Sequence, residues 1–81
     1  MNEEFKEKLE HHLKEELSDV VHYDVLAEEA EVPWQRELLL RTRNDEYRHA
    51  ARIREILKCY GYEIQDHPEV YSLWEKIKEL Q

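Results

Sequence analysis

Three side chains that commonly bind metal ions are spaced so that helices could bring them together. Glu46 and His49 lie three residues apart, so a helix would place them on one face. Glu16 lies upstream in a second strongly helical segment. Carboxylate oxygens with one imidazole suit iron or manganese, whereas a structural zinc site usually has thiolate ligands. The residue types therefore predict redox chemistry at a divalent metal rather than hydrolysis.

The segments around these residues predict two long helices joined by a short turn. Asn2 is suited to cap a helix over about residues 3–30, and the pair Val32-Pro33 should end it. A second helix should run over about 33–60 and end at Gly61, which tolerates a left-handed backbone. Two long helices joined by such a short turn should lie antiparallel.

A connector and a third, shorter helix over about residues 68–80 should follow, with Asp66 or His67 as its cap. No run of alternating apolar and polar residues predicts a strand. The predicted fold class is therefore all-α, with one domain over residues 1–81: an antiparallel two-helix hairpin plus a short C-terminal helix.

The apolar stripes of the two long helices are each interrupted by ionisable residues, and stripes of this kind are expected to be buried. The predicted stripes are Leu9, Leu13, Glu16, Val20, Tyr23, Ala27 and Ala30, and Leu39, Thr42, Glu46, His49, Ile53, Ile56 and Tyr60. With a turn at Val32 and ~1.5 Å of rise per residue, the three interruptions lie 21–26 Å from the turn. We therefore expect Glu16, Glu46 and His49 to meet at one depth.

Three ligands from one chain are too few to enclose two metal ions. A two-fold axis would double them to four glutamates and two histidines, the ligand set of di-iron four-helix bundles. The ligand count therefore predicts a homodimer with a di-iron centre at its interface, where manganese or zinc can substitute. Glu46 should bridge the metals, with Glu16 and His49 as terminal ligands.

Composition excludes several other kinds of partner. The net charge of −8 argues against nucleic acid, whose phosphates require a basic face. No apolar stretch approaches the ~18 residues of a membrane span. The acidic start, MNEEFKEKLE, is unlike a secretory signal, and the single Cys59 suits a reducing compartment. We therefore expect a cytoplasmic protein.

At these positions the sequence resembles the ferritin-like superfamily, and most closely the encapsulated ferritins, whose chains each carry half a bundle. The resemblance covers roughly residues 8–80 and rests on Glu15-Glu16-Leu17, on Tyr23, and on the run Asn44-Asp45-Glu46-Tyr47-Arg48-His49-Ala50-Ala51. It implies ferroxidase activity at Glu16, Glu46 and His49, for iron storage or detoxification. It also implies a decameric ring of dimers working inside an encapsulin shell.

The resemblance has departures near the site. Glu15 matches a glutamate on the family's metal access path, but Ser18 replaces a nearby acid and His22 replaces an aromatic residue. Tyr23 and His12 are candidates for an outer role beside the metal ligands, although a core aromatic and a surface histidine are the simpler interpretations. No encapsulin-targeting tail is recognisable at the last residues, so a free cytosolic protein and a truncated chain are the alternatives.

Other interpretations of the trio stay open. Glu16, Glu46 and His49 could form a buried polar network or pair with Arg43 or Arg48. A rubrerythrin-like scavenger of peroxide or oxygen uses similar helices, but commonly with a cysteine cluster that this sequence lacks. A metal-free helical interaction module belongs to a different class, and its assembly should not depend on metal.

Overall fold

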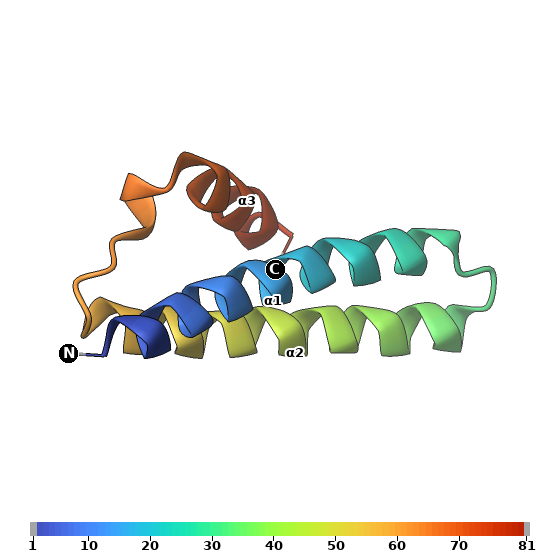
Figure 1. Cartoon of the computed structure of the whole chain (residues 1–81). Helices are drawn as coiled ribbons and strands as arrows, with labels where there is room; N and C mark the ends of the chain where they lie inside the picture. The colour runs from blue at the N-terminus through green and yellow to red at the C-terminus, as the bar shows by residue number, and fades with distance from the viewer. Residues whose placement is uncertain (1, 81) are drawn as a thin grey trace.

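The computed structural model describes residues 2–80, so Met1 and Gln81 of the predicted domain lie outside the described residues. The described residues form three α-helices and one 3₁₀ turn, and they contain no strand. Helix α1 spans Glu3–Glu29, α2 spans Pro33–Lys58 and α3 spans Pro68–Lys78, with the 3₁₀ turn η1 at Ile64–Asp66. Figure 1 shows α1 and α2 as a long antiparallel hairpin with α3 folded back over it. The all-α prediction is confirmed.

Local chemistry explains where the hairpin begins and turns. The side chain of Asn2 accepts a hydrogen bond from the Phe5 N–H at 3.1 Å, which caps the start of α1. Val32 is extended and Pro33 is the first residue of α2, as the sequence predicts. Arg36 reaches back and donates to the Ala30 carbonyl at 2.6 Å, which satisfies a backbone acceptor at the end of α1.

The end of α2 depends on a glycine. Gly61 has φ of 79°, the one positive φ among the described residues, and the Tyr62 N–H donates to the Leu57 carbonyl. The chain leaves α2 through this turn and passes η1 before α3 begins. His67 occupies the N-cap position of α3 without a side-chain hydrogen bond, so its role there is backbone geometry alone.

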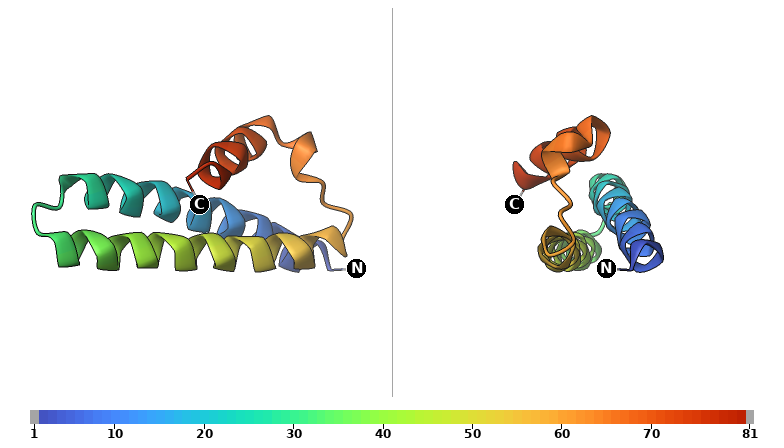
Figure 2. Two further views of the ribbon diagram at one scale, coloured as in Figure 1. Left: turned by 180° about the vertical axis from the view of Figure 1, so that it is seen from behind. Right: turned by 60° about the vertical axis from the view of Figure 1, so that its left-hand side comes forward.

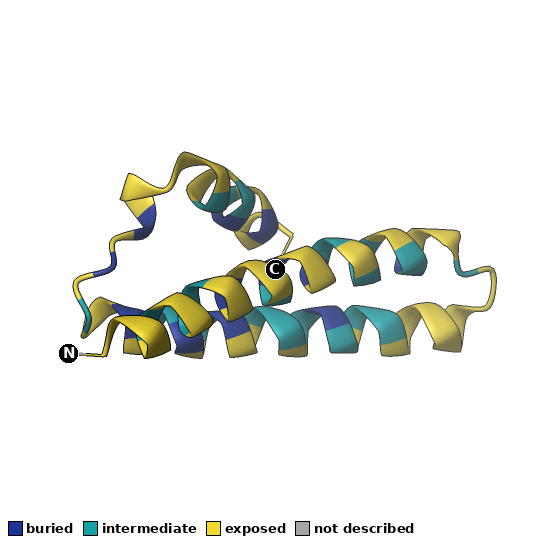
Figure 3. Cartoon of the chain, viewed as in Figure 1, coloured by how far each residue is buried: buried dark blue, intermediate teal, exposed yellow. Residues whose placement is uncertain are grey.

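Helix α3 covers one side of the hairpin, and the two views in Figure 2 show it resting over α1 and α2 together. Trp74 lies at the centre of this contact, with its ring 5.2 Å from the Tyr47 ring and the Arg54 guanidinium 4.8 Å above it. The core formed on this covered side comprises Leu13, Leu17, Val20, Ala50, Ile53, Leu57, Tyr62, Ile64, Trp74 and Ile77. Figure 3 shows these buried positions along the seam of the hairpin and on α3.

Arg43 ties the three helices together on the covered side. It is the only charged residue in the buried class among residues 2–80, at 9% exposure. Its guanidinium donates to the Asp24 carboxylate on α1, to Asn44, and to the Leu80 carbonyl just after α3 at 2.9 Å. A buried charge with this many partners is compensated, so Arg43 contributes to holding α3 in place.

No element formed by residues 2–80 covers the opposite side of the hairpin (Figure 2), and we call this side the open face. Helical spacing assigns to it Phe5, His12, Glu16, Tyr23 and Leu26 of α1, Ala30 just after α1, and Trp34, Leu38, Thr42, Glu46, His49, Ile56 and Tyr60 near or on α2. Four large apolar residues of this face are well exposed: Phe5 at 44%, Trp34 at 62%, Leu38 at 50% and Ile56 at 45%.

The predicted stripes therefore differ from the core of the single chain. Ile53 is buried as expected, whereas His49 and Ile56 are exposed. The physical reason is the position of α3. It covers a face of α2 that lies about one residue further along than predicted, so Arg43, Ala50 and Leu57 are buried where Thr42, His49 and Ile56 were expected. Leu13, Val20 and Ala27 of the predicted stripes are also buried, so only part of each stripe faces the open side.

The molecule is elongated, with extents of 48 × 20 × 15 Å and a radius of gyration of 13.9 Å. A compact chain of this length would have a radius of gyration of about 12 Å. None of the described helices combines the length and apolar character needed to cross a membrane.

Candidate metal centre

The three predicted ligands come together between the two long helices. Glu16 of α1 and Glu46 and His49 of α2 each offer one ligand atom, and these atoms lie within 4.8 Å of one another. The His49 Nδ1 atom is 3.8 Å from Glu16 Oε2 and 3.6 Å from Glu46 Oε1. This is the one such group of potential ligands in the described part of the chain. The depth argument from the sequence thus placed three residues correctly across a hairpin.

The cluster contains an unsatisfied polar atom. Glu16 and Glu46 keep only 13% and 19% of their side-chain surface exposed, whereas His49 keeps 49%. The Glu16 Oε2 atom is fully buried and has no hydrogen-bond partner, the single case found in residues 2–80. An unpartnered buried carboxylate oxygen costs folding free energy, so this position favours a cation or a proton.

The electrostatics of the pair point the same way. The pKa of Glu46 is raised above its usual value, first by a side-chain hydrogen bond with Glu16, then by burial and by the Glu16 charge. Asp45 adds to the rise, while His49 partly offsets it. The folded chain therefore disfavours two ionised carboxylates side by side. A bound metal ion would offset the repulsion between two ionised carboxylates.

The arginines considered as alternative partners lie elsewhere. Arg43 pairs with Asp24 on the covered side, and Arg48 pairs with Asp45 on the surface of α2. Neither arginine forms an ion pair with the Glu16 and Glu46 carboxylates in the described structure. The interpretation that the trio pairs with Arg43 or Arg48 is therefore wrong.

Of the residues predicted to have an outer role beside the ligands, only His12 contacts the cluster. His12 contacts the cluster directly, with its Nε2 atom 3.1 Å from Glu16 Oε1. Glu15 is exposed and pairs instead with His11 on the surface. Tyr23 is half-buried two turns further along α1, with its ring 6.0 Å from that of His22.

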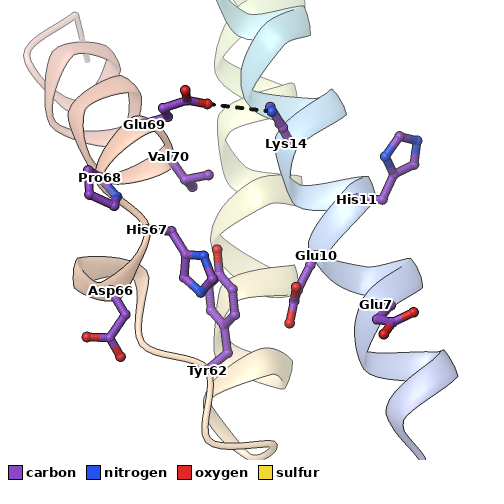
Figure 4. A pocket seen from close by; sticks show the side chains of 10 residues that line it. All are labelled: Glu7, Glu10, His11, Lys14, Tyr62, Asp66, His67, Pro68, Glu69 and Val70. Carbon is purple, nitrogen blue, oxygen red and sulfur yellow. Dashed lines mark ion pairs between the residues drawn. The ribbon is translucent and has the colours of Figure 1, made fainter.

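A surface pocket that sequence reasoning missed lies away from the cluster. It has a volume of about 700 Å³ between the start of α1 and the η1–α3 segment. Figure 4 shows the side chains that line it: Glu7, Glu10, His11, Lys14, Tyr62, Asp66, His67, Pro68, Glu69 and Val70. The Tyr62 and His67 rings stack at 4.4 Å, and Lys14 pairs with Glu69 at 3.8 Å. The sequence feature that could have indicated it is the connector over residues 62–67, which ends at Pro68, the first residue of α3.

The donor set of the cluster fits iron. Two carboxylates and one imidazole provide the hard oxygen and borderline nitrogen ligands that Fe(II) accepts, and they leave coordination positions for a second ligand set. Comparisons with models of known families, with curated proteins and with solved structures found no match to this chain.

Proposed function

We propose that this protein is a ferroxidase that binds Fe(II) at Glu16, Glu46 and His49 and oxidises it to Fe(III) for iron storage or detoxification. The observation that carries the proposal is the buried, unpartnered Glu16 Oε2 atom inside a group of three potential metal ligands. A polar network without metal would need a proton on one of the two carboxylates to compensate that oxygen, whereas a cation compensates both ionised carboxylates together.

The proposal includes a homodimer, because one chain supplies too few ligands for two metal ions. The open face supports this arrangement, since its ligand cluster lies between two apolar ends. Leu38 lies on the turn side of Glu46 and Ile56 on the other side, at about 12 and 15 Å along the helix. A two-fold axis at the level of Glu46 would set the Leu38 end of one copy against the Ile56 end of the other. The result would be a four-helix bundle with the metals inside.

In such a dimer the residues have distinct roles. The two Glu46 carboxylates would bridge two Fe(II) ions, while Glu16 and His49 would each hold one ion from the side. Each Fe(II) gives up one electron, so a pair of substrate ions reduces one dioxygen to hydrogen peroxide with two protons, or one peroxide to water. The carboxylates favour the ferric product because negative ligands stabilise the higher charge.

The resemblance to encapsulated ferritins extends the proposal to larger assemblies. It implies a decameric ring of dimers and a place within an encapsulin compartment of the cytoplasm. These two points rest on the motif run from Asn44 to Ala51 and on the spacing of Glu16 and Tyr23.

The test is anaerobic titration of the purified protein with Fe(II), followed by exposure to oxygen while ferric absorbance is recorded. We expect saturation near one iron per chain and oxidation faster than in a protein-free control. A chain that takes up no Fe(II) would contradict the proposal.

The variant Glu46→Ala removes the bridging carboxylate from each half of the centre. We expect it to lose tight Fe(II) binding while circular dichroism shows unchanged helix content, because Glu46 contributes little to the core. The matched control is Glu55→Ala on the same helix, where an exposed glutamate pairs only with Lys58. Stoichiometric Fe(II) binding by Glu46→Ala would show that the ligand assignment is wrong.

One observation favours a second candidate, a metal-free helical interaction module. The exposed Trp34 and Leu38 line an apolar hollow of about 510 Å³ near the turn, together with Leu26, Glu29, Ala30, Gln35 and Leu39. Such a surface fits a partner helix whether or not metal is bound. Self-association that is equally tight with a chelator and with Fe(II) would favour this candidate.

A further inference from the structure

Two histidine–glutamate pairs lie side by side on α1 and differ in one respect. His11 and Glu15 form one pair, His12 and Glu16 the other, and both have an Nε2–Oε1 distance of 3.1 Å. The glutamate of the first pair is 59% exposed, whereas that of the second is only 13% exposed. The same contact distance thus leads to a solvated carboxylate in one pair and to a candidate metal ligand in the other.

The two oxygens of Glu16 have different surroundings. Oε1 lies against His12, whose side chain is 55% exposed to solvent. Oε2 is buried, lacks a hydrogen-bond partner and is the atom 3.8 Å from His49 Nδ1. The outer oxygen of the carboxylate therefore has an imidazole nitrogen beside it, whereas the inner oxygen is buried next to His49.

We propose that His12 is a positioning residue for metal binding at Glu16, which rests on the ferroxidase centre proposed above. In the tautomer protonated on Nε2, His12 donates a hydrogen bond to Oε1 and fixes the rotation of the carboxylate. Glu16 then presents Oε2 alone to the metal, as a monodentate ligand. Hydrogen bonds of this outer kind commonly contribute a factor of roughly 10–100 to metal affinity.

His12 acts through Glu16 rather than as a fourth ligand. It does not belong to the group whose ligand atoms lie within 4.8 Å of one another, because it approaches the outer oxygen. A ligand role would require an imidazole at position 12. A positioning role requires only an N–H donor at the place of Nε2, and the side-chain amide of glutamine provides one there.

The experiment is a titration with Co(II), which does not react with oxygen under these conditions and whose visible absorption reports its ligands. The protein is compared with His12→Ala, His12→Gln and the matched control His11→Ala, with helix content checked by circular dichroism. We expect roughly 10–100-fold weaker binding for His12→Ala. We expect near-native affinity and an unchanged visible spectrum for His12→Gln, and no change for His11→Ala.

Two results would overturn the inference while leaving the metal centre intact. One is native affinity in His12→Ala. The other is a His12→Gln protein that binds as weakly as His12→Ala with an altered spectrum, because that outcome would make His12 a direct ligand. A parent protein that binds neither Co(II) nor Fe(II) would instead refute the proposed function, and the inference with it.

Discussion

The two sides of the hairpin solve different physical problems. On the covered side, α3 completes an apolar core around Trp74, and the one buried charge, Arg43, has several hydrogen-bond partners. On the open face, large apolar side chains remain exposed and Glu16 keeps a buried oxygen without a partner. The comparison teaches that the stabilising core lies mainly on the side of α3, while the proposed chemistry lies on the opposite side, where the proposal places a metal and a second chain.

The largest expected effect is a loss of stability when the core of the covered side is disrupted. Leu17 is fully buried there, and Leu17→Ala should lower the free energy of unfolding by about 2–5 kcal/mol, since it leaves a cavity that α3 cannot fill. Urea unfolding of the metal-free protein followed by circular dichroism measures this loss. The control is Leu38→Lys on the open face, which should stay within about 0.5 kcal/mol of the parent. Equal losses for both variants would remove the distinction between the two sides.

A smaller effect concerns the open face and assembly. Leu38→Lys should weaken self-association in the presence of metal by at least about tenfold, because it places a charge where an apolar contact is proposed. Sedimentation velocity with and without Fe(II), under anaerobic conditions, measures the change. The matched control is Tyr71→Lys, another exposed large apolar residue, on α3. Unchanged association in Leu38→Lys would place the dimer interface elsewhere.

The smallest expected effect is a change in the pH dependence of stability, caused by the two neighbouring carboxylates on the open face. Since folding raises the pKa of Glu46 above its ordinary value of 4.5, the folded metal-free chain binds this proton more tightly than the unfolded chain. Its contribution to stability is therefore complete below that value and is lost as the pH rises through the folded pKa. Glu46→Gln should remove this loss, so its melting temperature in chelator should exceed that of the parent near neutral pH.

The measurement for this last prediction is thermal unfolding at pH 4.5 and at pH 7 in excess chelator. The control is Glu55→Gln, whose carboxylate is exposed. A Glu46→Gln protein that shows the same fall in melting temperature between the two pH values as the parent would argue against repulsion at the cluster.

Much of this fold follows from local sequence rules. Asn2, Pro33 and Gly61 set the helix limits through capping, fixed φ and left-handed backbone, all of which act within a few residues. The alignment of Glu16 with Glu46 and His49 followed from helical rise and a short turn. Such inferences succeed because they depend on the geometry of one or two elements.

Tertiary placement was harder to predict. The sequence does not show which side of the hairpin α3 covers, so the exposure of His49 and the burial of Arg43 were not foreseen. The side-by-side His11 and His12 also look equivalent in sequence. Only the burial of Glu16 relative to Glu15 separates them, and that depends on how α1 rotates against α2.

The elongated shape has a consequence for measurement in solution. In the proposed dimer the second copy lies alongside the first, so the mass doubles while the longest dimension stays near the 48 Å of one chain. On dimerisation, small-angle scattering would then show a twofold rise in forward intensity divided by protein mass concentration. The maximum dimension of the particle would stay almost constant. If metal drives dimerisation as proposed, adding it would increase the thickness of the particle without changing its length.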